Sequence, residues 1–160
     1  MSLDLAPFDT GLIEARLRDA LVGTGKPLRQ VSGAADYAAI KALKDFPAPC
    51  AYVVLDNEAM QPHPPGSAPR GAQVAMGQIV PVVFGVAIAV RNYREQRGAQ
   101  MKDGLRDVVG RVRSRLLGWV PDVRGGRPCR LQRGYVDDYD DATLLWIDMY
   151  QTQHSIGSTP

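Results

Sequence analysis

The feature of the sequence that most constrains the fold is a continuous apolar run over Gln78–Asn92. Its residue types favour a strand, whereas Pro81 and Gly85 argue against a buried helix. Because successive side chains of a strand point to opposite sides, the run has one bulky face and one mostly small face, and both are apolar. At ~3.3 Å per residue, it spans roughly 46 Å, so we expect a bulge or bend, with Pro81 as its site. We predict the central strand of a sheet that is covered on both faces.

Apolar periodicity before this run predicts two helices and a strand. A short amphipathic helix follows a cap at Asp9 or Thr10, and a second helix covers Ala34–Lys44. Pro47 and Pro49 follow that helix, and the apolar stretch Cys50–Leu55 is typical of a strand. The stretch from Leu28 to Val31 fits either a minor strand or a linker.

After this strand, Asn57–Gly77 is rich in proline and glycine and predicts a long mobile loop between antiparallel strands. The clearest helical period covers Ala99–Leu117 and predicts a helix. Its glycines would permit close packing on the small face of the central strand. The alternative partner of that small face is the sheet of a neighbouring subunit. Cys129–Val136 and Thr143–Gln153 predict a hairpin, and the tail from about residue 155 is expected to be loose. We therefore predict one domain over residues 1–160 with an α+β fold: a mostly antiparallel sheet of about four strands, packed with two main helices and one short helix.

Composition places the chain among ordinary globular proteins. It has 160 residues, a formal net charge of +2, 45% hydrophobic and 22% charged residues, which does not indicate a nucleic-acid binder or a disordered chain. The first residues lack the basic and apolar regions of a signal peptide. Cys50 and Cys129 match no metal spacing, and we interpret them as reduced, buried side chains, which favours a cytosolic origin.

Two clusters of charge are candidates for binding. Four aspartates lie in the turn of the predicted hairpin: Asp137, Asp138, Asp140 and Asp141. They could hold a hard cation, but the run lacks the pattern of a calcium loop, so a solvated turn or a contact with a basic surface is favoured. The basic surface is one side of the last helix, which carries Lys102, Arg106, Arg111, Arg113 and Arg115 and precedes Arg124, Arg127, Arg130 and Arg133. Nucleic acid is one partner for such a surface, but the aromatic interleaving of single-strand binders is missing. A solvated face or a contact between subunits is therefore favoured.

The sequence contains no recognisable active site. His63 and His154 have neither a nucleophile beside them nor a second ligand at helical spacing. A small enzyme such as a hydrolase would need these histidines or the acidic cluster to converge in a pocket. We expect no catalytic residues, no metal and no cofactor.

Several local strings, taken in order, make the chain resemble the tail terminator proteins of long-tailed bacteriophages, including the lambda-like minor tail protein and the terminators of Mu-like prophages. They extend from about residue 8 to residue 155 and include Phe46-Pro47-Ala48-Pro49-Cys50-Ala51-Tyr52-Val53-Val54, Phe84-Gly85-Val86-Ala87-Ile88-Ala89-Val90-Arg91-Asn92, Leu117-Gly118-Trp119-Val120-Pro121 and Gln151-Thr152-Gln153. None of these strings is a catalytic signature. The match depends on their order and spacing.

This resemblance implies a structural role, as a small α+β domain that closes into a homo-oligomeric ring, a hexamer, on the tail tube. The ring would end tube growth, bind a head-completion or neck protein and let DNA pass as cargo, without any membrane. The protein would lie in the bacterial host cytoplasm during assembly and then in the virion tail. By physical argument we expect the loop to contact the tube, through His63, Arg70, Gln73 and Met76. The same argument pairs the arginines of the last helix (Arg106, Arg111, Arg113 and Arg115) with the acidic turn of another subunit.

Overall fold

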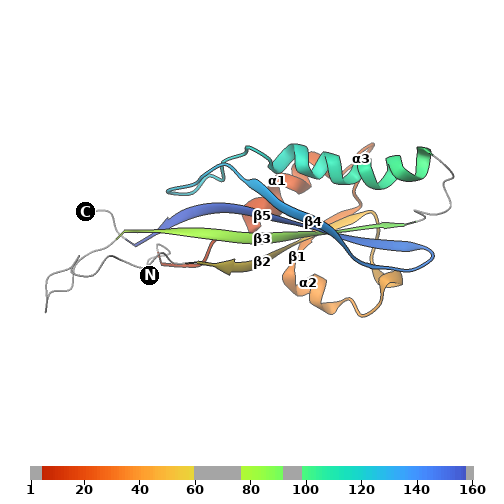
Figure 1. Ribbon diagram of the computed structural model, residues 1–160, viewed down its shortest axis with the longest axis horizontal. Helices are drawn as coiled ribbons and strands as arrows, with labels where there is room; N and C mark the ends of the chain where they lie inside the picture. The colour runs from red at the N-terminus through yellow and green to blue at the C-terminus, as the bar shows by residue number, and fades with distance from the viewer. Residues whose placement is uncertain (1–4, 60–76, 92–98, 158–160) are drawn as a thin grey trace, which may run out of the picture.

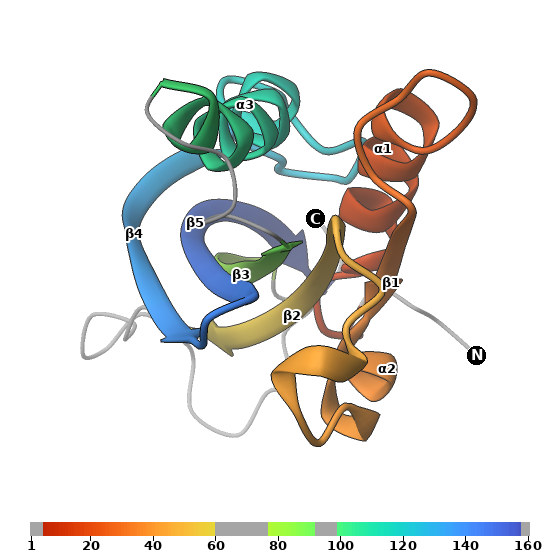
Figure 2. The same cartoon turned by 90° about the vertical axis from the view of Figure 1, so that its right-hand side faces the viewer.

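The computed structural model describes residues 5–59, 77–91 and 99–157, and these form a curved sheet with helices on both sides (Figures 1 and 2). The strand order is β1-β2-β3-β5-β4. The elements, in chain order, are α1 (Gly11–Leu21), β1 (Gln30–Gly33), α2 (Ala34–Ala39), the 3-10 turn η1 (Leu43–Asp45), β2 (Cys50–Glu58), β3 (Gln78–Arg91), α3 (Ala99–Leu116), β4 (Arg130–Tyr139) and β5 (Thr143–Ile156).

The predicted α+β class is confirmed, but the sheet has five strands instead of about four. The additional strand is β1, which pairs in parallel with the start of β2 while the other neighbouring strands are antiparallel. Val31 in β1 is 3% exposed and belongs to the main core. A strand of four residues is too short for an alternating pattern to distinguish it from a linker.

β3 is the central strand, as predicted, and it pairs along its length with β2 on one side and β5 on the other. The prediction of a bulge at Pro81 is wrong. Pro81 lies opposite Gln153 in an unbroken register with β5, and its carbonyl accepts a hydrogen bond from the amide of Ala59. The irregularity lies in β2, between Leu55 and Asn57.

The bulky face of β3 carries the main core, and α1 and α3 cover it (Figure 2). Val109, Val112 and Leu116 of α3 pack in one cluster with Val86 and Ile88. The expectation that α3 covers the small face is therefore wrong. The large side chains of the bulky face offer the apolar stripe of α3 more atomic contacts than the small face would, and each contact adds dispersion energy. Gly110 supports no close packing either, since a Cβ built there has no neighbour within 4 Å.

Among the described residues, helical cover of the small face of β3 is found at one end of the strand. There α2 and η1 pack on it in a second cluster, in which the rings of Tyr37, Phe46 and Tyr52 meet edge to face. The predicted helix over residues 34–44 is divided, because Ile40 adopts extended backbone angles (φ −81°, ψ 124°) before η1 begins. In the view of Figure 1, α2 lies below the sheet and α3 lies above it.

Three strands end later than predicted, and one of them is β4, which continues past Val136 to Tyr139. β2 continues through Asn57 and Glu58, so the predicted loop begins later, and its residues 60–76 lie outside the described part of the chain. β5 extends to Ile156, and the amide of Ser155 donates to the carbonyl of Arg124, so the tail is not loose from residue 155.

Both cysteines are free and buried, as predicted for small core side chains. Burial raises the pKa of the Cys50 thiol to about 11 and that of the Cys129 thiol to about 11. Because the thiolate is the reactive form, neither cysteine is poised for chemistry near neutral pH.

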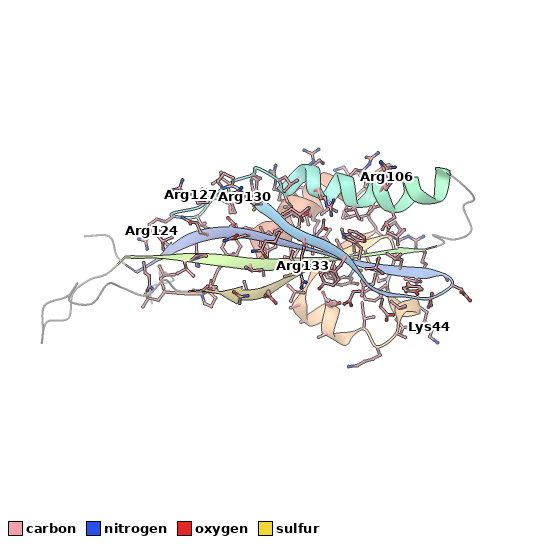
Figure 3. The ribbon with its side chains drawn as sticks, in the orientation of Figure 1. Lys44, Arg106, Arg124, Arg127, Arg130 and Arg133 are labelled. Atoms are coloured by element: carbon pink, nitrogen blue, oxygen red, sulfur yellow. The ribbon has the colours of Figure 1, made fainter. Side chains whose placement is uncertain are left out.

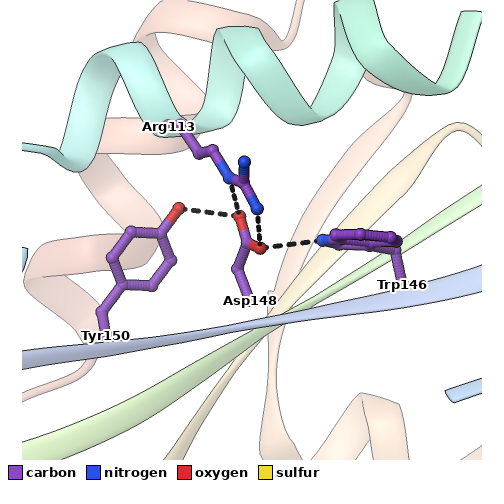
Figure 4. Close-up of polar contacts among 4 residues, drawn as sticks. All are labelled: Arg113, Trp146, Asp148 and Tyr150. Carbon is purple, nitrogen blue, oxygen red and sulfur yellow. Dashed lines mark hydrogen bonds and ion pairs between the residues drawn. The ribbon is translucent and has the colours of Figure 1, made fainter. Parts of the chain in front are cut away.

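A buried carboxylate fastens α3 to the sheet (Figure 4). The side chain of Asp148, in the middle of β5, is 0% exposed, and four donors surround it. The Nε and Nη2 atoms of Arg113 each donate at 2.8 Å, Trp146 Nε1 donates at 2.8 Å, and Tyr150 Oη donates at 3.1 Å. A buried charge is tolerated when it is paired and fully hydrogen-bonded, as here. The bond to Asp148 raises the pKa of Arg113 above its usual value, and burial followed by the Asp148 charge raises the pKa of Tyr150.

Gly134 in β4 makes room for this cluster. A Cβ at that position would lie 2.5 Å from Asp148 Oδ1, 2.6 Å from Arg113 Nη2 and 2.8 Å from Trp146 Cζ2. Distances this short force a neighbouring group to move. The absence of a side chain at residue 134 is thus a packing requirement of the ion pair.

Replacing the carboxylate should destabilise the fold far more than removing an exposed ion pair of the same helix. We expect Asp148→Asn to lower the free energy of unfolding by about 3 kcal/mol, the lower end for a broken buried pair, because the Arg113 side chain keeps 31% exposure. Arg111→Ala removes a pair whose side chains are 55% and 54% exposed and should cost less than ~1 kcal/mol. Urea unfolding measures both, and equal losses would contradict the role of Asp148.

Two glycine substitutions should act in opposite directions. Gly134→Ala should destabilise the protein by about 1–3 kcal/mol, because its methyl group overlaps the Asp148 cluster. Gly110→Ala, in the open on α3, should stabilise it by up to about 1 kcal/mol through helix propensity. Thermal unfolding of the two variants gives the signs, and a stabilised Gly134→Ala would show that the cluster has spare room.

Candidate functional site

The outer side of α3 and the connection that follows it form a basic surface, visible along the upper edge of Figure 3. We define it by its exposed arginines, which are Arg106, Arg111, Arg115, Arg124, Arg127 and Arg130. Arg111 forms an ion pair with Asp107 one turn away, at 3.1 Å. Within residues 5–59, 77–91 and 99–157, no ion pair involves Arg106, Arg115, Arg127 or Arg130. This surface therefore carries positive charge that its own described neighbours leave largely uncompensated.

Arg113 does not belong to the basic surface, contrary to the prediction. Its guanidinium turns toward the sheet and is bound by Asp148, with the Trp146 ring 5.9 Å from its Cζ atom. Arg113 follows the buried Val112 and borders the apolar stripe of α3. Helical spacing alone is therefore compatible with a side chain that turns toward the sheet or toward solvent. The sequence did contain a signal, because an aspartate in the middle of an apolar strand requires a cationic partner.

The end of β4 and the turn that follows it carry the acidic tip, defined as Asp137, Asp138, Asp140 and Asp141, all of which are exposed. Asp140 organises the turn: its Oδ1 atom accepts from the amides of Ala142 and Thr143 at 2.8 and 2.7 Å. These two bonds lower the pKa of Asp140. Asp140 and Asp141 lie in the turn, but the prediction that all four aspartates lie there is wrong, because β4 continues to Tyr139 and includes Asp137 and Asp138. In the described part of the chain no group of three or more histidine, cysteine or acidic side chains is arranged to hold a metal ion.

The acidic tip and the basic surface lie on different sides of the sheet. Asp137 is near Tyr37 of α2, where its charge, after burial, raises the pKa of the tyrosine. Asp138 likewise lines a small hollow with Leu43 of η1. The tip is therefore on the α2 side, whereas the basic surface is on the α3 side (Figure 1). The fold does not bring the two predicted partners together within one chain, so they can meet only between copies.

His154 is part of a buried contact between distant segments. Its Nε2 atom lies 2.9 Å from Glu58 Oε1, which also accepts from the amide of Phe8 at 2.6 Å, and the Phe8 ring packs against the imidazole edge to face. Glu58 and His154 are 96 residues apart, so no local pattern could have paired them. His154 lies near the end of β5 and the acidic tip near its start, so the two do not converge in a pocket.

The predicted contact loop cannot be compared with the structure. His63, Arg70, Gln73 and Met76 lie outside the described residues, and for Lys102 only its position in α3 is described. None of the described helices has the length and apolar character needed to span a bilayer.

Comparison with known proteins supports the resemblance found in the sequence. A search of curated proteins gives no significant match. A family model described as "Phage tail terminator protein" matches residues 3–160, which is nearly the full chain. The match covers every described element, from α1 to the end of β5. The chain belongs to the phage tail terminator protein family.

Proposed function

We propose that this structural protein of the phage tail closes into a ring of identical copies, six in number, on the end of the tail tube. The ring stops polymerisation of the tube and offers the surface to which a head-completion or neck protein binds. The observation that carries the proposal is the family match over residues 3–160. The assembly forms in the host cytoplasm, and DNA crosses the ring as cargo.

The arrangement of charge supports assembly by contact between copies. The basic surface and the acidic tip are complementary in sign and lie on opposite sides of the sheet. Two different surfaces that bind each other make a head-to-tail contact, and such contacts generate a closed ring when the rotation between copies permits it. Complementary charges also guide the register in which copies associate.

The tube is the proposed partner of the segment between β2 and β3, residues 59–77. Glu58 and Gln78 bound this segment on neighbouring strands, so β2 and β3 hold its two ends. We assign tube contact to His63, Arg70, Gln73 and Met76 within it. Neither this assignment nor the ring requires a catalytic residue or a cofactor.

Charge reversal on the basic surface should prevent ring formation. The variant Arg106→Glu/Arg115→Glu leaves Arg113 and its buried pair intact, and the reversed side chains would repel the acidic tip of the next copy. We expect monomers by size-exclusion chromatography with light scattering, where the wild type gives rings. Mixing this variant with Asp137→Lys/Asp138→Lys should restore assembly, because every contact then again joins opposite charges.

The matched control is Lys26→Glu/Arg29→Glu, which changes net charge equally at two exposed positions outside both surfaces. It should still form rings. If the control dissociates as well, net charge and not the proposed contact controls assembly. If the Arg106→Glu/Arg115→Glu variant remains a ring, the pairing of these surfaces is wrong.

A nucleic-acid-binding module is the second candidate, favoured by Arg127 and Arg130. Both line one open hollow of about 880 Å³ beside Gln151 and Gln153. If this candidate is correct, the wild type retards duplex DNA in a gel at low salt, and Arg127→Ala/Arg130→Ala loses the shift, since phosphate contacts supply salt-dependent affinity. An absence of retardation at low salt would contradict it.

A further inference from the structure

The small face of the sheet contains an apolar hollow of about 390 Å³ that no element of the described chain fills. It lies where α2 stops covering the sheet. Its floor comes from three strands and its wall from α2, through Val54, Gly85, Ile147, Met149, Ala34 and Ala38. Gly85 leaves space above the floor of the hollow because it has no side chain; a Cβ there would lie 3.1 Å from Met149 Sδ. An apolar depression of this kind fits an apolar side chain.

The rim of this sheet hollow carries a carboxylate. Asp56 lines it from the irregular part of β2. Its side chain is exposed, and within the described residues no cation forms an ion pair with it. The hollow therefore fits an apolar group that has a basic neighbour.

Such a group is present on the opposite side of the molecule. Leu117, at the end of α3, is 46% exposed, and Val120 beyond it is 47% exposed. Arg127 and Arg130 line the same open surface as Leu117. Large apolar side chains beside arginines are typical of the centre of a binding interface.

We propose that the sheet hollow receives Leu117 from a neighbouring copy, with Arg127 of that copy facing Asp56. The end of α3 and the helix α2 lie on opposite sides of the same middle part of the sheet (Figure 1), as a repeated head-to-tail contact requires. This inference rests on the proposed ring. It assigns Leu117 and the sheet hollow to the apolar centre of the contact between subunits, and the charged surfaces around them orient the two copies.

Filling the hollow tests the proposal. Ala38→Trp places a large ring on the exposed wall of the hollow, whereas Ala39→Trp places the same ring on the same helix at an exposed position that does not line the hollow. By light scattering, Ala38→Trp should lose the ring and Ala39→Trp should retain it. Thermal unfolding of both variants separates loss of contact from loss of fold.

A disulfide trap tests the partner directly. The native thiols are buried, so engineered surface cysteines dominate oxidation. A mixture of Ala38→Cys and Leu117→Cys should form the cross-linked heterodimer several-fold faster than a mixture of Ala39→Cys and Leu117→Cys. Cross-links of Ala38→Cys with itself that outpace the heterodimer would overturn the head-to-tail assignment.

The outcomes separate this inference from the proposed function. If Ala38→Trp assembles like the wild type and the trap gives equal rates, the hollow is not the contact, while the ring remains supported. If the wild type forms no ring at any concentration or on tail tubes, the proposed function is wrong. If that protein still gives the cross-linked heterodimer, the contact between copies remains supported without the ring. If it gives no cross-link, both the contact and the ring are rejected.

Discussion

The buried carboxylate of Asp148 is the interaction on which the arrangement of the helix layer depends. It lies on the face of β5 that α3 covers, and its four donors come from α3 and from its own strand. An unpaired charge there would be very unfavourable, so the position of α3 is restricted to one in which Arg113 reaches the sheet. Gly134 on the neighbouring strand supplies the necessary space. With Arg113 turned inward, the other arginines of α3 face outward, and the basic surface follows from the same contact.

The difference in side-chain size between the two faces of β3 explains where the chain uses its own helices and where it leaves sheet uncovered. Val82, Phe84, Val86 and Ile88 on one face are 0% exposed and support α1 and α3. On the other face Ala87 and Ala89 lie beneath the aromatic cluster around Tyr52, but at Gly85 the cover ends. A helix as short as α2 cannot extend further, since it has six residues. No residue in the described part of the chain covers the apolar floor beyond it.

The sequence predicted those parts of the fold that are determined locally. The strand at residues 78–91, the helix at residues 99–116 and the final hairpin each repeat their period over enough residues to be recognised. The side of the sheet on which α3 packs was predicted wrongly, because periodicity identifies an apolar face without identifying its partner. Arg113 was assigned to the surface for a related reason: it borders the buried stripe, and its partner lies 35 residues away. The contact of Glu58 with His154 likewise depends on tertiary structure alone.

The ring that we propose must stop adding copies once it is complete, and the placement of surfaces in this fold suits that requirement. In one copy the end of α3 and the hollow beside α2 lie on opposite sides of the sheet, so a copy cannot satisfy both by itself or in a symmetric pair. In the proposed assembly, association through them would continue until the chain of copies closes, and closure would leave no free contact of that kind. The acidic tip lies at one end of the curved sheet and takes part in the proposed contact between copies. The opposite end, where the segment between β2 and β3 begins, has no part in that contact, and in the proposed assembly it is left for the tube.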